Sequence, residues 1–208
     1  MHLAARSTCR NLGRIGYRDG LAIQQEYAAR RLRGVIGDTL LLCEHDPVIT
    51  LGTNADAGQV LDRSRAEVVR CDRGGQTTWH GPGQIVGYAI CDLEARGRDL
   101  HRFCRDLEAV MLFALDAFGL KGRRIAGLTG VWLADEKVGA LGVRVRRWIS
   151  THGFALNVDC DLSYYEGIIP CGIPDKGVTS MARALGRPLD LEPVKEACAR
   201  GFQEIFLG

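Results

Sequence analysis

Apolar side chains recur every three or four residues from Leu100 to Phe118. This spacing predicts an amphipathic helix, with Asp99 as its N-cap and Gly119 as its stop signal. Shorter stretches with related patterns predict further helices over residues 17–32, 179–186 and 191–207.

Runs of apolar and β-branched residues predict strands over residues 37–45, 47–52, 66–72, 84–93, 130–148 and 152–158. Asp46–Pro47 separates the first two runs, which predicts a hairpin, and another hairpin is expected to turn at Asp135–Glu136. The segment 73–84 then connects two strands at a sheet edge, and residues 163–177 are irregular. We therefore predict one domain over 1–208 of class α+β, with helices flanking a mixed, mostly antiparallel sheet.

The composition excludes several classes of protein. Lys and Arg number 27 against 25 Asp and Glu, a net charge of +2, so no global field favours nucleic acid or a membrane. No apolar run approaches the roughly 20 residues of a membrane span, and the first ten residues lack a secretory core. A basic opening without acids before Asp19 leaves an organelle-targeting segment open as an alternative to a cytoplasmic protein.

The eight cysteines are scattered and mostly lie within apolar runs, as buried small hydrophobes do. The chain contains neither a C-x-x-C pair nor an H-E-x-x-H motif, so no metal and no dithiol redox pair is expected. A reducing cytosol fits this pattern best, and the sequence indicates no cofactor.

The stretch "RGGQTTWHGPGQ" (73–84) holds four glycines between two predicted strands. It does not match G-x-G-x-x-G, and a strand pattern follows it, so a dinucleotide or phosphate loop is excluded. The glycines allow backbone to approach backbone or ligand closely, as a narrow slot for an unbranched chain requires. An ordinary turn-rich connection is the alternative.

Lys137 is one of only four lysines. Strand alternation places it on the side of Leu141, Val143 and Val145, with Arg144 pointing the other way. A buried lysine there suits a general base or a cation beside a thiolate, whereas a lysine in the turn would reach solvent. Both interpretations remain open at this point.

Three further side chains are candidates for chemistry. His152 shares strand parity with Phe154, and His80 lies in the glycine-rich loop; each can be a structural or a catalytic residue. Cys171 stands apart from the other cysteines because "IIPCGIP" places it between prolines and beside a glycine, where a thiol can face a ligand.

Several of these segments together resemble one family. "RGGQTTWHGPGQIVGY", "KVGALGVRV", "THGFALNV" and "PCGI…GVTS" resemble the lipoyl(octanoyl) transferases in order and separation, and "LGRIGYRDGLAIQ" and "EHDPVITLG" extend the match. The resemblance implies a fold like the catalytic domain of biotin and lipoate protein ligases. It also implies transfer of an octanoyl group from acyl carrier protein to a lysine of a lipoyl domain, without a cofactor.

By the same resemblance, Cys171 is the acyl-thioester nucleophile and Lys137 its activating partner. The acceptors would be the lipoyl domains of 2-oxoacid dehydrogenase complexes and the glycine cleavage H protein. Substrate contacts map onto Arg73, Gly74, Gly75, Gln76, Thr77, Thr78, Trp79, His80, Ala140, Leu141, Gly142, Gly153, Phe154 and Ala155.

Trp79 stands where the family usually has tyrosine, so a larger ring could reshape the slot and change the chain-length preference.

Two other classes of protein are alternatives to the transferase. An ATP-dependent lipoate or biotin ligase would not use a cysteine nucleophile, and a silent carrier-binding module would lack the Cys171–Lys137 pair. The outward arginines 144, 146 and 147 are the expected contact for an acidic carrier.

Overall fold

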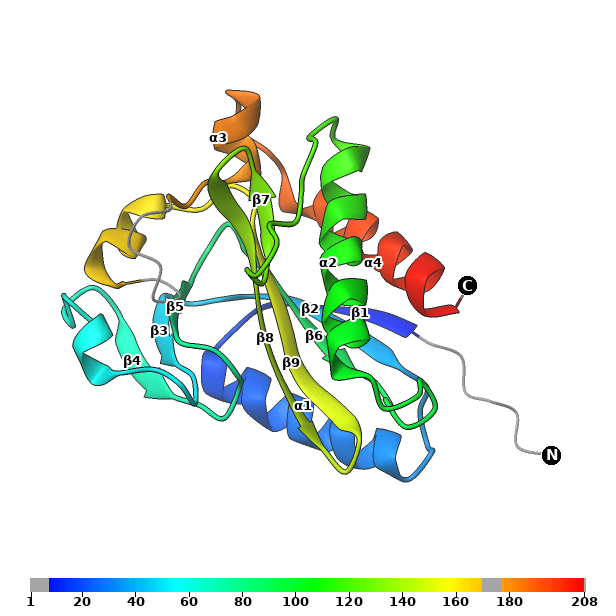
Figure 1. Ribbon diagram of the computed structural model, residues 1–208. Coiled ribbons are helices and arrows are strands. Elements are labelled where there is room, and N and C mark those ends of the chain that lie inside the picture. The colour runs from blue at the N-terminus through cyan, green and yellow to red at the C-terminus, as the bar shows by residue number, and fades with distance from the viewer. Residues whose placement is uncertain (1–7, 170–176, 208) are drawn as a thin grey trace.

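The computed structural model describes residues 8–169 and 177–207. Two sheets form the scaffold (Figure 1). The larger has six strands in the order β1 (Thr8–Ile15), β2 (Thr39–His45), β6 (Gln84–Ile90), β9 (Ile149–Asn157), β8 (Glu136–Arg146) and β7 (Val131–Leu133). The smaller has three in the order β4 (Glu67–Arg70), β3 (Val48–Leu51) and β5 (Thr77–His80).

Only β1–β2 and β3–β4 pair in parallel among the described strands, so the sheets are mixed and mostly antiparallel. The helices are α1 (Tyr17–Leu32), α2 (Leu100–Ala117), α3 (Met181–Leu185) and α4 (Leu191–Leu207), with short 3-10 helices η1 (Ala57–Gln59) and η2 (Leu162–Gly167). The α+β prediction is confirmed. None of the described helices is long and apolar enough to cross a membrane.

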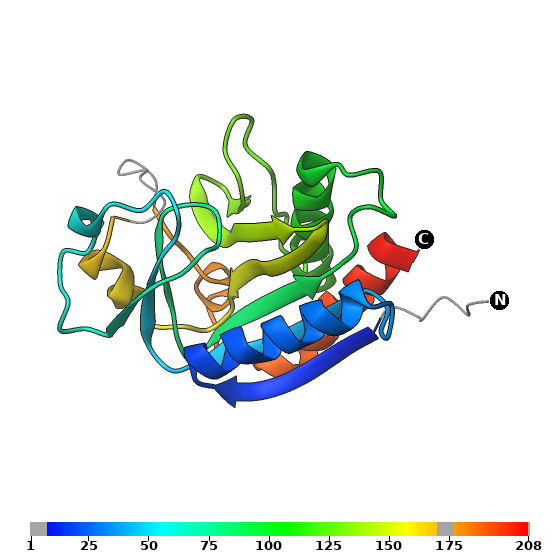
Figure 2. The ribbon, with the colours of Figure 1, turned by 90° about the horizontal axis from the view of Figure 1, so that it is seen from below.

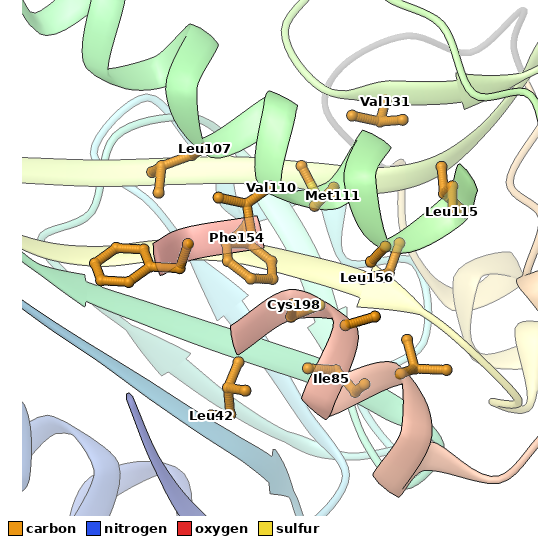
Figure 3. Close-up of a cluster of buried hydrophobic side chains, with 14 of the residues drawn as sticks. Leu42, Ile85, Leu107, Val110, Met111, Leu115, Val131, Phe154, Leu156 and Cys198 are labelled. Carbon is orange, nitrogen blue, oxygen red and sulfur yellow. The ribbon is translucent and has the colours of Figure 1, made fainter. Parts of the chain in front are cut away.

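Helices α2 and α4 cover one face of the six-stranded sheet, and α1 packs on the other. Figure 3 shows the cluster beneath α2 and α4, in which Met111 and Val110 from α2 meet Phe154 and Leu156 from β9. Phe154 is 2% exposed, and truncation of such a buried ring to alanine costs about 3–5 kcal/mol. Figures 1 and 2 place the three-stranded sheet at the end of the molecule opposite the start of β1 and the end of α4.

The helix boundaries follow the local signals. Helix α1 has the predicted bounds, and the Asp99 side chain caps α2 by accepting from the backbone N–H of Arg102. Gly119, with φ +74°, ends that helix in the left-handed conformation that favours glycine. Helix α3 has the same pattern at its end, where Gly186 has φ +64°.

Three predictions about strands were wrong or incomplete. Strands β2 and β3 do not form a hairpin, because β2 pairs with β1 and β6 while β3 pairs with β4 and β5 in the other sheet. The segment 73–84 contains a strand of its own, β5, in addition to the turns. Strand β1 was not predicted, because an edge strand with exposed Arg10 and Asn11 shows no apolar alternation.

Candidate active site

A cavity of about 430 Å³ lies where the two sheets meet, within the range of small-molecule sites. Strands β8 and β9 form one wall, and β5 with the loop before it forms another. The lining includes Lys137 and all the residues that the resemblance assigned to substrate binding except Trp79: Arg73, Gly74, Gly75, Gln76, Thr77, Thr78, His80, Ala140, Leu141, Gly142, Gly153, Phe154 and Ala155. Tertiary structure thus brings together three segments that lie far apart in the sequence.

The glycines of the loop allow it to pack directly on β8. The backbone N–H of Gly74 donates to the carbonyl of Val143 at 2.9 Å. A Cβ at Gly142 would lie 2.9 Å from the carbonyl oxygen of Gly74 and 3.0 Å from Cδ of Arg73, so a side chain would push the loop away. Gly75 has φ +86°, a conformation that other residues adopt only with strain. At Gly74 and Gly75 the cavity wall therefore consists of backbone.

Trp79 does not line this cavity. Its ring is fully buried and stacks on Tyr164, with ring centroids 4.8 Å apart, in the cluster beneath the three-stranded sheet. Strand alternation explains the placement, because Thr78 and His80 face the cavity and the residue between them faces away. The expectation that a larger ring at position 79 narrows the slot therefore finds no support in the geometry.

Lys137 occupies a different face from the one that alternation predicted. A β-bulge pairs Trp132 with Lys137 and Val131 with Gly139, so one residue of β8 is inserted between the two pairs. Val138 consequently packs in the core beneath α2, with Leu141 on the same face, whereas Lys137 lies with Ala140 on the cavity side. Of the two interpretations that the sequence left open, the structure favours the buried lysine, but Lys137 lies on the opposite face of β8 from Leu141.

Among the described residues, no acidic side chain pairs with the ammonium group of Lys137. The side chain is 9% exposed, and Nζ lies 4.9 Å from the centre of the Trp132 ring, a cation–π contact. No carboxylate among the described residues forms an ion pair with it. Its backbone donates to the carbonyl of Gly177 at 2.9 Å and accepts from Thr179 at 3.0 Å. Cys171, the predicted nucleophile, lies outside the described residues.

Arg73 is a second buried cation on the cavity wall, 7% exposed, and no described carboxylate pairs with it. Its Nη2 donates to the carbonyl and the hydroxyl of Thr50 at 2.9 and 2.8 Å, and its Nη1 donates to the carbonyl of Gly74 at 3.0 Å. These bonds fix the glycine-rich loop to strand β3. The guanidinium therefore holds the wall of the cavity in place.

Two histidines near Arg73 are held neutral. Burial lowers the pKa of His80 to about 3, and the charges at His45 and Arg73 add to the shift. Burial likewise lowers the pKa of His152 to about 4, with further contributions from Arg73 and Arg144. Because carbonyl and carboxylate oxygens only accept, His80 Nδ1 donates to Gln84 Oε1 at 2.7 Å, and His152 Nε2 donates to Asp72 Oδ1 at 2.9 Å.

His152 is buried, as predicted, but it does not share a face with Phe154. It has φ +58°, and its ring contacts Tyr88 on the side of α1, whereas Phe154 packs beneath α2 and α4. The left-handed backbone at this position breaks the alternation that sequence reasoning assumed.

Several lining residues were missed in the sequence. They come from α1, α2, β6 and two loops, and they include Tyr17, Asn54, Val86, Tyr88, Leu100, Cys104, Gly127, Leu128 and Thr129. None follows a motif, so only the packing of helices on the sheet reveals them.

A second hollow of about 490 Å³ lies between α1 and the far end of β8, and Arg144, Arg146 and Arg147 line it. Arg144 also contacts the carboxylate of Asp72.

Comparison with known proteins shows the family of the chain. Residues 16–203 match the family model for the lipoyl protein ligase A/B catalytic domain. The octanoyltransferase of Rhodospirillum rubrum is 44% identical over 92% of this chain and 91% of its own length. Those of Solibacter usitatus and Rubrobacter xylanophilus are 47% and 48% identical, over 97% and 91% of this chain and 94% and 89% of their own lengths.

Solved structures with low identity share the fold. Lipoate-protein ligase A bound with ATP superposes with a TM-score of 0.75 at 15% identity, over 99% of this chain and 86% of the other. A putative lipoate protein ligase from T. acidophilum gives 0.73 at 15% identity, over 97% and 85%. The predicted resemblance to ligase catalytic domains is confirmed at the level of fold. From the family match and the octanoyltransferase relatives, the chain belongs to the lipoyl protein ligase A/B catalytic-domain family and is an octanoyltransferase.

Proposed function

We propose that the chain transfers octanoyl groups through a thioester on Cys171, with Lys137 as the partner that stabilises the thiolate and later accepts a proton. The observation that carries the proposal is the buried ammonium of Lys137 on the wall of the acyl-sized cavity, with an aromatic ring beside it and no described acid to neutralise it. A buried cation of this kind favours an anion nearby, and a thiolate is the anion that acyl transfer requires.

The chain path supports the pairing of these two residues. Gly177 lies six positions after Cys171, and its carbonyl accepts a hydrogen bond from the backbone N–H of Lys137. The backbone N–H of Thr179 in turn donates to the carbonyl of Lys137. Residues 177–179, which follow the predicted nucleophile in the sequence, are therefore attached to the strand that carries the lysine.

The chemistry balances over two half-reactions. The Cys171 thiolate attacks the thioester carbonyl of the donor, a new C–S bond forms, and the carrier thiol departs with a proton from Lys137. The neutral amine of the acceptor lysine then attacks the enzyme thioester, a C–N bond forms, and Cys171 leaves as a thiolate. Lys137, now neutral, takes the surplus proton of the amine and returns to its starting state.

The donor and acceptor complete the proposal. The donor is octanoyl-acyl carrier protein, and the acceptors are lipoyl domains, including those of 2-oxoacid dehydrogenase complexes and the glycine cleavage H protein. One structural relative belongs to an archaeal lipoylation system, a bi-partite lipoate protein ligase and its E2 lipoyl domain from Thermoplasma acidophilum. Docking of the acidic carrier on arginines 144, 146 and 147 stays a prediction. The proposed setting is the cytoplasm, where cysteines remain reduced.

Intact-mass analysis after incubation with octanoyl carrier protein, without ATP, tests the route. The wild-type protein should gain one octanoyl group, which peptide mapping should locate on Cys171, and a lipoyl domain added afterwards should remove it. Cys171→Ser should gain none. The matched control is Cys104→Ser, because Cys104 is a half-buried thiol at the same cavity, and this variant should still acquire the adduct. Transfer that requires ATP and leaves no adduct would indicate ligase chemistry instead.

A further inference from the structure

Beside Lys137 the structure contains a small chamber that the substrate cavity does not account for. Its volume is about 20 Å³, and its walls carry Thr78, Lys137, Asn157 and Tyr165 among small apolar groups. A space of this size holds one water or one oxygen atom. Thr78 and Lys137 also line the acyl cavity, so the chamber lies at the border of the site where the reaction is proposed.

The hydrogen-bonding groups of Asn157 are occupied elsewhere. Its Oδ1 accepts from Gln84 Nε2 at 2.8 Å and from the Tyr165 hydroxyl at 3.2 Å, and its Nδ2 donates to the carbonyl of Thr179 at 3.0 Å. The Tyr165 hydroxyl also accepts from Gln84 Nε2 at 3.1 Å. These bonds make Asn157 and Tyr165 a rigid wall rather than donors to a substrate.

Thr78 differs from both. It is 8% exposed, and its hydroxyl is hydrogen-bonded to no residue that the structure describes. Its neighbour Thr77, which also lines the cavity, donates its hydroxyl to Gln59 Oε1 at 2.8 Å. Of the two hydroxyls that β5 contributes to the cavity, that of Thr77 is bonded to Gln59 and that of Thr78 has no described protein partner. The Thr78 hydroxyl is therefore available to a group bound in the cavity.

We propose that the Thr78 hydroxyl is a catalytic group that donates a hydrogen bond to the thioester carbonyl oxygen as it becomes an oxyanion in the chamber. When Cys171 attacks the carbonyl carbon, the C–S bond forms and the carbonyl π electrons move to the oxygen. The Thr78 O–H and the nearby ammonium of Lys137 stabilise that charge, and collapse of the intermediate expels the carrier thiol. The inference rests on the proposed thioester route.

Thr78→Val tests the proposal because valine keeps the branched shape and fits a strand but removes the hydroxyl. The single-turnover rate of Cys171 acylation by octanoyl carrier protein should fall about 100-fold, as on loss of an oxyanion donor. In steady-state assays the KM for octanoyl carrier protein should stay nearly constant, because the hydrogen bond strengthens only in the transition state. Thr78→Ser, which restores a hydroxyl, should recover most of the rate.

Two controls separate catalysis from structure. Thr39→Val removes a buried hydroxyl from β2 that donates to the carbonyl of Gly37 at 3.0 Å, outside the cavity, and should leave the acylation rate unchanged. The pH profile of Cys171 alkylation should be the same in Thr78→Val and wild type, because the hydroxyl acts on the carbonyl and not on the thiol.

An acylation rate in Thr78→Val close to wild type would overturn the inference, as would a shifted alkylation midpoint or a Thr78→Ser rate no better than that of Thr78→Val. These results differ from a failure of the proposed function. If the wild-type protein itself forms no octanoyl adduct, the thioester route is wrong, and the role of Thr78 falls with it.

Discussion

Lys137 and Arg73 are both buried cations on the wall of one cavity, but their surroundings differ. Three of the hydrogen bonds that Arg73 donates go to oxygen atoms of Thr50 and Gly74, which joins the glycine-rich loop to β3. Lys137 has the face of Trp132 beside its ammonium and no described acid. A cation that donates hydrogen bonds to neighbouring protein oxygens stabilises the fold, whereas one without such bonds is available for chemistry.

The largest effect should come from Lys137→Met. We expect kcat to fall by about 10³-fold or more, because both the thiolate-stabilising charge and the proton acceptor disappear. The pKa of the Cys171 thiol should rise towards or above the free value of about 8.5. Measuring the alkylation rate of Cys171 against pH, by peptide mapping, compares the variant with wild type.

The same variant should unfold no more easily than wild type, because it removes a buried charge rather than a network of hydrogen bonds. A normal alkylation midpoint in Lys137→Met would show that the lysine does not stabilise the thiolate. Its role would then be limited to accepting the proton of the acceptor amine.

Arg73→Met should give the opposite result, a loss of stability. Three buried oxygen atoms lose their charged donor, so the free energy of unfolding should fall by about 2–4 kcal/mol. Chemical denaturation with an unchanged m-value would measure this. Arg73→Lys should recover only part of the loss, since one ammonium cannot reproduce the planar fork of the guanidinium. Stability equal to that of wild type would show that the loop holds its place without the hydrogen bonds of Arg73.

A smaller effect concerns the pH dependence of stability, which the two buried histidines near Arg73 should produce. The unfolded chain protonates its histidines below about pH 6.5, whereas folded His152 and His80 stay neutral down to about 4 and about 3. Proton uptake by the unfolded state therefore lowers stability as the pH falls below about 6.5, by about 1.4 kcal/mol per pH unit for each histidine. Thermal or urea unfolding between pH 7 and pH 5 should show this slope.

His152→Gln should reduce the slope of stability against pH by the contribution of about one histidine, and its amide can still donate to Asp72. His101→Gln, a change at an exposed position of α2, is the matched control and should leave the slope as it is. If His152→Gln has the same slope as wild type, His152 titrates equally in the folded and unfolded states.

Local signals in the sequence determined much of the molecule. The period of apolar residues and the caps at Asp99 and Gly119 place α2, because a helix satisfies its own backbone and its ends need only local partners. The glycine-rich loop and the segments at Ala140 and Gly153 were expected to contact substrate, which stays a prediction, and the structure places all three along one cavity. That expectation came from the family resemblance, which carries information about three-dimensional structure that a single sequence pattern lacks.

Only the tertiary structure decided which face each residue occupies. The bulge in β8 moved Lys137 to the cavity side, and the left-handed backbone at His152 reversed its direction, since one inserted or rotated residue breaks a period of two. The partners of β3 were equally undetermined, because pairing depends on strands distant in sequence. The uncommitted hydroxyl of Thr78 has the same origin: the sequence places two threonines side by side, and only the packing around β5 gives Thr77 a partner and leaves Thr78 facing the site.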